Sequence, residues 1–132
     1  MTTEAPPPTG AILVVDDQRA MRMLVRSSLR QLGYDNVVEC EDGKDALRML
    51  AGRRTCLVIS DLNMPNLDGL GLLRAVRAST EHKSTPFILL TARGDVDVVK
   101  QAVVIGVSGY LVKPFAMGQF KQKVEAAIGA RV

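Results

Sequence analysis

Residues 12–18 of the chain read ILVVDDQ, a run of four apolar residues that ends on two adjacent carboxylates, Asp16 and Asp17. An unbroken, β-branched apolar run of this length is typical of a strand that is covered on both faces, as in parallel sheets. Two neighbouring negative charges at the end of such a strand repel each other, and a surface turn or a bound cation would explain them. The stretch therefore predicts a buried parallel strand and a candidate binding site at its carboxyl end.

Short apolar segments alternate with longer amphipathic segments along the rest of the chain. In the first amphipathic segment, apolar residues recur at the spacing expected of the core-facing stripe of a helix, at Met21, Leu24, Val25, Leu29 and Leu32. Five strands alternating with five helices predict an α/β fold, a doubly wound parallel sheet with right-handed crossovers and helices on both faces. The predicted strands are 11–15, 36–40, 56–60, 86–92 and 109–114, and the predicted helices are 18–32, 43–52, 72–79, 95–106 and 116–128.

The composition fits one ordinary globular domain. The chain has 132 residues, is 47% hydrophobic and 23% charged, and carries a net charge of +3, which gives no argument for direct DNA binding. No apolar run is long enough to span a membrane, and two cysteines without secretory features indicate a cytoplasmic location. Residues 1–10 are expected to be a disordered Pro-rich tail, and residues 11–130 the folded domain, which we expect to be monomeric.

The residues at the strand ends form the candidate site, because ligands of open parallel sheets bind beyond the carboxyl ends of the strands. Asp16 and Asp17 follow the first predicted strand, Asp61 the third, Thr91 ends the fourth and Lys113 lies near the end of the fifth. Three converging carboxylates suit a hard cation such as Mg²⁺. A carboxylate beside Mg²⁺ can attack a phosphoryl group and form an aspartyl phosphate, and Asp61 is the best placed to do so.

Each of these residues also has an ordinary structural interpretation. Asp17 and Thr91 could each cap a helix, and Lys113 could be a solvent-exposed loop residue. The combination across four strand ends favours the functional interpretation over these separate ones.

Four segments resemble the receiver domain of two-component response regulators: DD at 16–17, ISDLNMPNLDG at 59–69, TA at 91–92 and GYLVKPF at 109–115. The resemblance covers about residues 11–130 and is strongest for stand-alone receivers of the chemotaxis type. It implies a flavodoxin-like (βα)5 fold with the strand order 2-1-3-4-5.

The resemblance also implies roles at the site. Asp61 matches the phosphoacceptor of the family, and Lys113 matches the lysine that contacts the phosphoryl group. Asp16 and Asp17 match the acidic pair that binds Mg²⁺ together with Asp61. Asn63 matches the position whose backbone carbonyl also binds the metal.

Two further positions match the family's conformational switch, and two depart from its pattern. Thr91 matches the switch hydroxyl, and Tyr110 matches the aromatic side chain that changes rotamer. Leu62 stands where chemotaxis receivers usually have Trp, and Arg93 stands where an acidic residue is typical. Since Arg93 and Asn63 flank the route of an attacking water, the rate of dephosphorylation is left open.

The fourth predicted helix is more apolar than a single core-facing stripe requires. Val96 and Val103 are expected to be exposed if Val99, Ala102 and Ile105 serve the core. The alternative is a helix that is simply well buried. The family resemblance favours a partner-binding face formed by the fourth helix, the fifth strand and the last helix, with the candidate residues Val96, Val99, Val103, Tyr110, Val112 and Lys123.

Four arginines of the first predicted helix, Arg19, Arg22, Arg26 and Arg30, form a basic stripe through their helical spacing. A solvated helix face explains the stripe. The alternative is that the stripe binds an acidic partner, which would be a phosphotransfer domain, a flagellar protein or an anionic nucleotide.

We therefore expect a single-domain response regulator. It would accept a phosphoryl group on Asp61 from a histidine kinase or phosphotransfer domain and signal to an output protein such as the flagellar switch. It would not be an enzyme beyond its own phosphorylation and slow dephosphorylation. The alternatives are a phosphate-independent or nucleotide-gated adaptor and a receiver in a phosphorelay other than chemotaxis. A flavodoxin-type carrier is disfavoured because DDQRAM replaces the phosphate loop that it would need.

Overall fold

The computed structural model describes residues 10–129. Within that range the chain forms a five-stranded parallel sheet with the order β2-β1-β3-β4-β5, which confirms the predicted fold class and strand order. Apart from Gly10, the predicted N-terminal tail lies outside the described residues. The strands are β1 (Ala11–Val15), β2 (Val37–Cys40), β3 (Thr55–Asp61), β4 (Phe87–Thr91) and β5 (Gly109–Val112), and the helices are α1 (Arg19–Gln31), α2 (Gly43–Leu50), α3 (Gly69–Ala78), α4 (Val96–Ile105) and α5 (Met117–Ile128).

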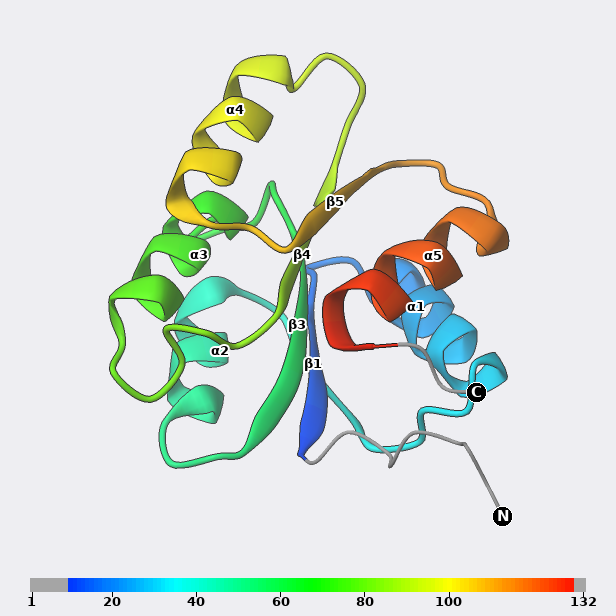
Figure 1. The fold of residues 1–132 in the computed structure, drawn as a ribbon, viewed down its shortest axis with the longest axis horizontal. Helices are drawn as coiled ribbons and strands as arrows, with labels where there is room; N and C mark the ends of the chain where they lie inside the picture. The colour runs from blue at the N-terminus through cyan, green and yellow to red at the C-terminus, as the bar shows by residue number, and fades with distance from the viewer. Residues whose placement is uncertain (1–9, 130–132) are drawn as a thin grey trace.

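Helices cover both faces of the sheet, with α1 and α5 on one side and α2, α3 and α4 on the other (Figure 1). Alternate residues of β1 enter different cores because successive strand side chains point to opposite faces. Ile12 and Val14 pack in the core formed with α1 and α5, whereas Leu13 and Val15 pack with α2 and α3. This double coverage is why the first strand is apolar at every position.

The more polar strand predicted near an edge, β2, is an edge strand. Several predicted boundaries differ by a few residues. Asp61 and Thr91 are the last residues of β3 and β4, and the N–H of Leu62 still donates to the carbonyl of Leu90 at 2.9 Å. The fifth strand ends earlier than predicted, at Val112.

The expectation that Leu24 faces the core is wrong, because its side chain is 51% exposed. At about 100° per residue, the buried residues of α1 span an arc of roughly 100°, and Leu24 lies just outside this arc. The buried residues of α1 are Val25, Ser28 and Leu29, and Leu24 lies beside them on the solvent side.

Gly69 allows α3 to begin directly against the end of β3. A side chain at this position would collide with the backbone of Asp61 and Leu62. The N–H of Gly69 donates to the carbonyl of Leu62 at 2.8 Å, and the side chain of Asp68 caps the helix by accepting from the N–H of Gly71. The turn after Asp61 is therefore fixed by local packing. None of the helices in residues 10–129 is long and apolar enough to cross a membrane.

Candidate functional site

Three carboxylates meet at the carboxyl edge of the sheet. Val15 of β1 is in register with Ser60 of β3, so the residues that follow them, Asp16 and Asp61, emerge side by side. Asp16 and Asp61 are buried and Asp17 is exposed. One oxygen from each of the three carboxylates lies within 4.8 Å of the others. The structure thus brings together the three carboxylates that the sequence predicted as metal ligands.

The carboxylate of Asp16 is only partly satisfied. Its Oδ1 accepts a hydrogen bond from the N–H of Gln18 at 2.8 Å, whereas its buried Oδ2 has no hydrogen-bond partner within the described chain. Burial raises the pKa of Asp16 above its usual value, the Gln18 hydrogen bond opposes this, and the neighbouring charge of Asp61 adds to the increase. A buried oxygen without a partner is costly. A hard cation that prefers oxygen ligands, such as Mg²⁺, fits this donor set.

Lys113 forms an ion pair with Asp61 across the adjacent strand, β4. Its Nζ lies 2.7 Å from Oδ1 of Asp61, and its backbone N–H donates to the carbonyl of Thr91 at 2.7 Å. The peptide bond between Lys113 and Pro114 is cis. The lysine therefore approaches the acidic cluster from the β5 side, as predicted.

Thr91 is buried at the end of β4, and its hydroxyl donates to the carbonyl of Leu111 at 3.4 Å. Tyr110, one residue earlier in β5, is partly exposed, and the ammonium of Lys123 lies 5.6 Å from the centre of its ring. The hydroxyl of Thr91 thus contacts the backbone beside Tyr110 and does not bond to Asp61 in this conformation.

A family model for the response regulator receiver domain matches residues 12–125, which include the acidic cluster and all of the sheet except Ala11. The chain belongs to the response regulator receiver family. The receiver is 42% identical over 114 residues to the chemotaxis protein CheY of Pseudomonas aeruginosa, and the match covers 86% of this chain and 92% of that protein.

Solved structures share the fold. CheY4 of Vibrio cholerae, a chemotaxis response regulator, superimposes with a TM-score of 0.81 at 31% identity, covering 89% of this receiver and 98% of that chain. The receiver domain of the sensor histidine kinase PA1611 of Pseudomonas aeruginosa gives a TM-score of 0.80 at 31% identity and covers 92% and 98% of the two chains. That domain is described with a magnesium ion coordinated in its active-site cleft.

The two departures from the family pattern have different surroundings. Leu62 is buried and packs in the core beside α2 and α3. Arg93 is exposed in the loop between β4 and α4. Asn63 is exposed in the loop after β3, and the role of its carbonyl in metal binding stays a prediction. Arg93 is thus the departure that adds charge near the site.

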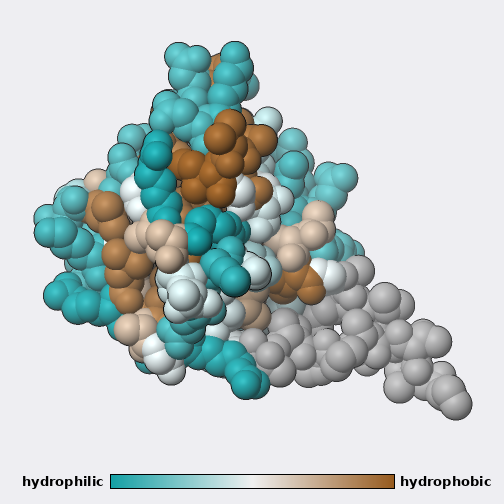
Figure 2. Space-filling model, turned by 60° about the vertical axis from the view of Figure 1, so that its left-hand side comes forward, coloured by the Kyte–Doolittle hydropathy of each residue, from teal (hydrophilic) through white to brown (hydrophobic). Residues whose placement is uncertain are grey.

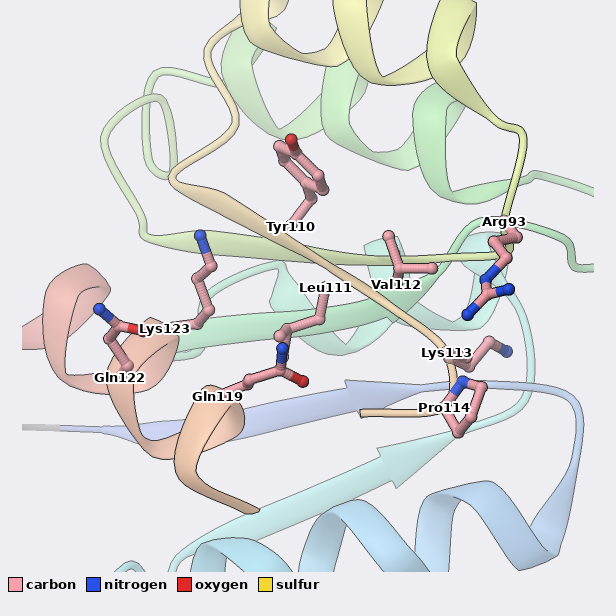
Figure 3. A pocket seen from close by; sticks show the side chains of 9 residues that line it. All are labelled: Arg93, Tyr110, Leu111, Val112, Lys113, Pro114, Gln119, Gln122 and Lys123. Atoms are coloured by element: carbon pink, nitrogen blue, oxygen red, sulfur yellow. The ribbon is translucent and has the colours of Figure 1, made fainter. Parts of the chain in front are cut away.

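A pocket of about 530 Å³ lies between β5, α5 and the loop that carries Arg93. Figure 3 shows Arg93 and Lys113 at one end and Lys123 rising from α5 toward Tyr110 at the other. Among the described residues that line it, three are basic and none is acidic. The full lining is Arg93, Tyr110, Leu111, Val112, Lys113, Pro114, Gln119, Gln122 and Lys123.

The exposed side of α4 carries valines beside polar residues, and Figure 2 shows a hydrophobic patch on the upper part of the molecule where α4 lies. Val96 and Val103 are each 60% exposed, in line with the expectation from the sequence. Val99 is only half-buried, and Val104, which the sequence analysis did not single out, is 88% exposed. The alternative of a well-buried helix is therefore wrong.

The predicted basic stripe is divided. Arg22 and Arg26 both form ion pairs with Glu39 of β2, at 3.1 and 2.7 Å, whereas Arg19 and Arg30 are exposed. Sequence reasoning missed Glu39. The signal was present, because an isolated carboxylate in the strand segment VVEC needs a partner if a helix covers that strand.

Proposed function

We propose that this receiver accepts a phosphoryl group on Asp61 from the phosphohistidine of a histidine kinase or phosphotransfer domain. The observation that carries the proposal is the position of the Asp61 carboxylate, 2.7 Å from Lys113 and clustered with Asp16 and Asp17. In the transfer, an Asp61 oxygen forms a bond to phosphorus while the P–N bond of the donor breaks, and the departing imidazole keeps the electron pair.

The residues of the site would have different roles in the transfer. Lys113 holds Oδ1 of Asp61, which leaves Oδ2 for the attack on phosphorus. Asp16 and Asp17, with Asp61, would hold Mg²⁺, and Asn63 would add its carbonyl. When bound, Mg²⁺ supplies neutralisation of the charge that develops on the phosphoryl oxygens. Lys113 supplies a second positive charge from the protein itself, and no catalysis beyond this phosphorylation and its slow reversal is proposed.

The signal would leave the site through Thr91 and Tyr110. A phosphoryl group on Asp61 offers the Thr91 hydroxyl a stronger acceptor than the carbonyl of Leu111, at 3.4 Å in this conformation. Movement of Thr91 toward Asp61 would vacate space for the ring of Tyr110 and shift the population of the α4–β5–α5 face. A differential partner affinity of about 1–3 kcal/mol is enough for such a switch.

The output partner would be recognised by the exposed valines of α4 and by the basic pocket beside them. Arg93 and Lys123 favour an acidic segment, and Val96, Val103 and Val112 favour apolar residues flanking it. The chemotaxis names of the Pseudomonas and Vibrio relatives support a flagellar motor partner. The cytoplasmic location and the monomeric state stay predictions.

The test is incubation with acetyl phosphate and Mg²⁺ followed by intact mass measurement. We expect a gain of one phosphoryl group that requires Mg²⁺ and is absent from the Asp61→Asn variant. Asp68→Asn is the matched control, since Asp68 is an exposed helix cap seven positions further along the same segment. Phosphorylation that persists in Asp61→Asn, or that never occurs in the unaltered protein, would refute the proposal.

A further inference from the structure

Arg22 is the one member of the basic stripe that reaches the metal-binding loop. Its Nη1 donates to the backbone carbonyl of Asp16 at 2.7 Å, and its Nε donates to Oε1 of Glu39 at 3.1 Å. Arg26, one turn further along α1, donates to Oε2 of the same glutamate at 2.7 Å. The side chain of Arg22 is 11% exposed, compared with 41% for Arg26, so only Arg22 is enclosed by the structure.

The carbonyl that Arg22 holds belongs to the peptide bond joining Asp16 to Asp17. Because a peptide bond is planar, fixing this carbonyl fixes the direction in which the chain continues into Asp17. The N–H of Asp16 donates to the carbonyl of Cys40 at 3.1 Å, and its carboxylate accepts from Gln18 at 2.8 Å. Arg22 is thus the third constraint on this loop and the only one of these three in which the donor is a side chain.

Glu39 holds Arg22 in place. It lies on β2 in register with Val14 of β1, so it is anchored to the strand that carries the acidic pair. The hydrogen bond from Arg26 is the main cause of the lowered pKa of Glu39, and Arg22 contributes further, which keeps the carboxylate charged. The planar guanidinium of arginine can bond two partners in fixed directions, whereas a lysine ammonium has no such fork.

We propose that Arg22 is a positioning residue for Mg²⁺: it orients the Asp16–Asp17 peptide, with Glu39 as its anchor, and thereby raises the affinity of the site for the metal. The inference rests on the proposed function, because it takes the acidic cluster as a Mg²⁺ site. The partners that orient metal ligands typically raise metal affinity by about 10–100-fold, and Arg22 acts on a ligand residue through its backbone, which places it at the lower end.

The sign of the effect separates positioning from simple electrostatics. A fixed positive charge near the acidic cluster repels Mg²⁺, so Coulomb interaction alone predicts tighter metal binding when Arg22 is neutralised. Loss of positioning predicts weaker binding. Arg22→Met removes both the charge and the donors, whereas Arg22→Lys keeps the charge and removes the fork.

The experiment is calorimetric titration of the unphosphorylated full chain with Mg²⁺, with thermal unfolding in metal-free buffer to confirm that each variant folds. We expect Arg22→Met to weaken Mg²⁺ binding about 10-fold and Arg22→Lys to weaken it in the same direction. Arg26→Met is the matched control, because Arg26 shares Glu39 but does not touch the loop, and its effect should stay within about twofold. Saturating Mg²⁺ should restore phosphorylation of Arg22→Met by acetyl phosphate to near the wild-type rate.

The outcomes are distinct. Unchanged or tighter Mg²⁺ binding by Arg22→Met, or equal losses in Arg22→Met and Arg26→Met, would overturn this inference and leave the proposed metal site intact. Absence of Mg²⁺ binding by the wild-type chain would overturn both. If Arg22→Met does not fold, Arg22→Lys and Glu39→Gln decide the matter, since both must also weaken Mg²⁺ binding.

Discussion

The carboxyl edge of the sheet and the helix α4 are neighbours in the chain and are built in opposite ways. At the edge, Asp16, Asp61 and Thr91 are buried at the ends of strands that have hydrogen-bonded neighbours on both sides. In α4, among its described residues, Ala102 alone is buried, and the valines on its outer face are exposed to solvent. The side chains of the first region are enclosed by the fold, whereas the second region would lose little buried surface if it moved.

Polar contacts also connect α4 and the residues that flank it to their surroundings. Arg77 Nε donates to the carbonyl of Gly106 at 2.9 Å, and Arg74 donates to Oε1 of Gln101 at 3.3 Å. At the other end, Oδ2 of Asp95 accepts from the N–H of Ala92 at 2.9 Å. Elements with few buried apolar contacts open at lower free energy than a sheet core. Under the proposed function, chemistry and response would therefore fall to regions of different local stability.

The largest effect is expected from a substitution at the carboxyl edge of the sheet. Gly69→Ala should lower the free energy of unfolding by about 3 kcal/mol, because the added methyl group collides with backbone atoms of Asp61 and Leu62 that cannot easily move. Gly118→Ala is the matched control near the start of α5, where a methyl group meets nothing within 4 Å. It should instead stabilise the protein by up to about 1 kcal/mol. Urea unfolding of both variants measures the difference, and equal effects would contradict the close approach at Gly69.

The second prediction uses the partly satisfied carboxylate at the same edge. Mg²⁺ at 100 times its dissociation constant should stabilise the wild-type protein by about 2.7 kcal/mol, and Asp16→Asn should lose most of this gain. Thermal unfolding with and without Mg²⁺ measures it. Gln18→Ala is the control, since Gln18 contributes only its backbone N–H to Asp16.

The pH dependence without metal should have a defined sign. Since the pKa of Asp16 is raised in the folded protein, its contribution to stability is fully present below the pKa of the unfolded chain and is lost as the pH rises through the folded pKa. From acidic to neutral pH, the metal-free wild type should therefore lose stability relative to Asp16→Asn. A constant difference between the two proteins across this range would show that Asp16 is not perturbed by burial.

The parallel sheet and the acidic cluster could be predicted because strands and helices alternate along the chain, whereas the order of the strands in the sheet came from the family resemblance. Continuous apolar runs such as residues 11–15 identify strands covered on both faces, and whatever follows parallel strands must share one edge. The direction of individual helix side chains was harder to predict. Leu24 and Val104 are as apolar as core residues, but they lie outside the parts of their helices that pack against the sheet. The pattern of apolar residues does not show how each helix is rotated relative to the sheet.

Pairings between distant residues were harder still. The link from Arg22 to Glu39 and to the carbonyl of Asp16 joins α1, β2 and the metal-binding loop. The spacing of the arginines indicates only that they share a helix face. Which of them turns inward depends on the strand that lies beneath α1, and this is a property of the folded sheet.

The smallest effect is expected from a substitution on the exposed face of α4. Val104→Ala should raise the free energy of unfolding by no more than about 0.5 kcal/mol, because the side chain is 88% exposed and alanine has the higher helix propensity. Ala102→Val, two positions earlier and buried, should instead cost about 1–3 kcal/mol through overpacking. Both changes should leave the rate of phosphorylation by acetyl phosphate unaltered in folded protein, since neither residue touches the acidic cluster. Urea unfolding and intact mass measure the two quantities. A loss of stability in Val104→Ala comparable to that in Ala102→Val would mean that the outer face of α4 is packed. The carboxyl edge of the sheet and α4 would then not differ in local stability.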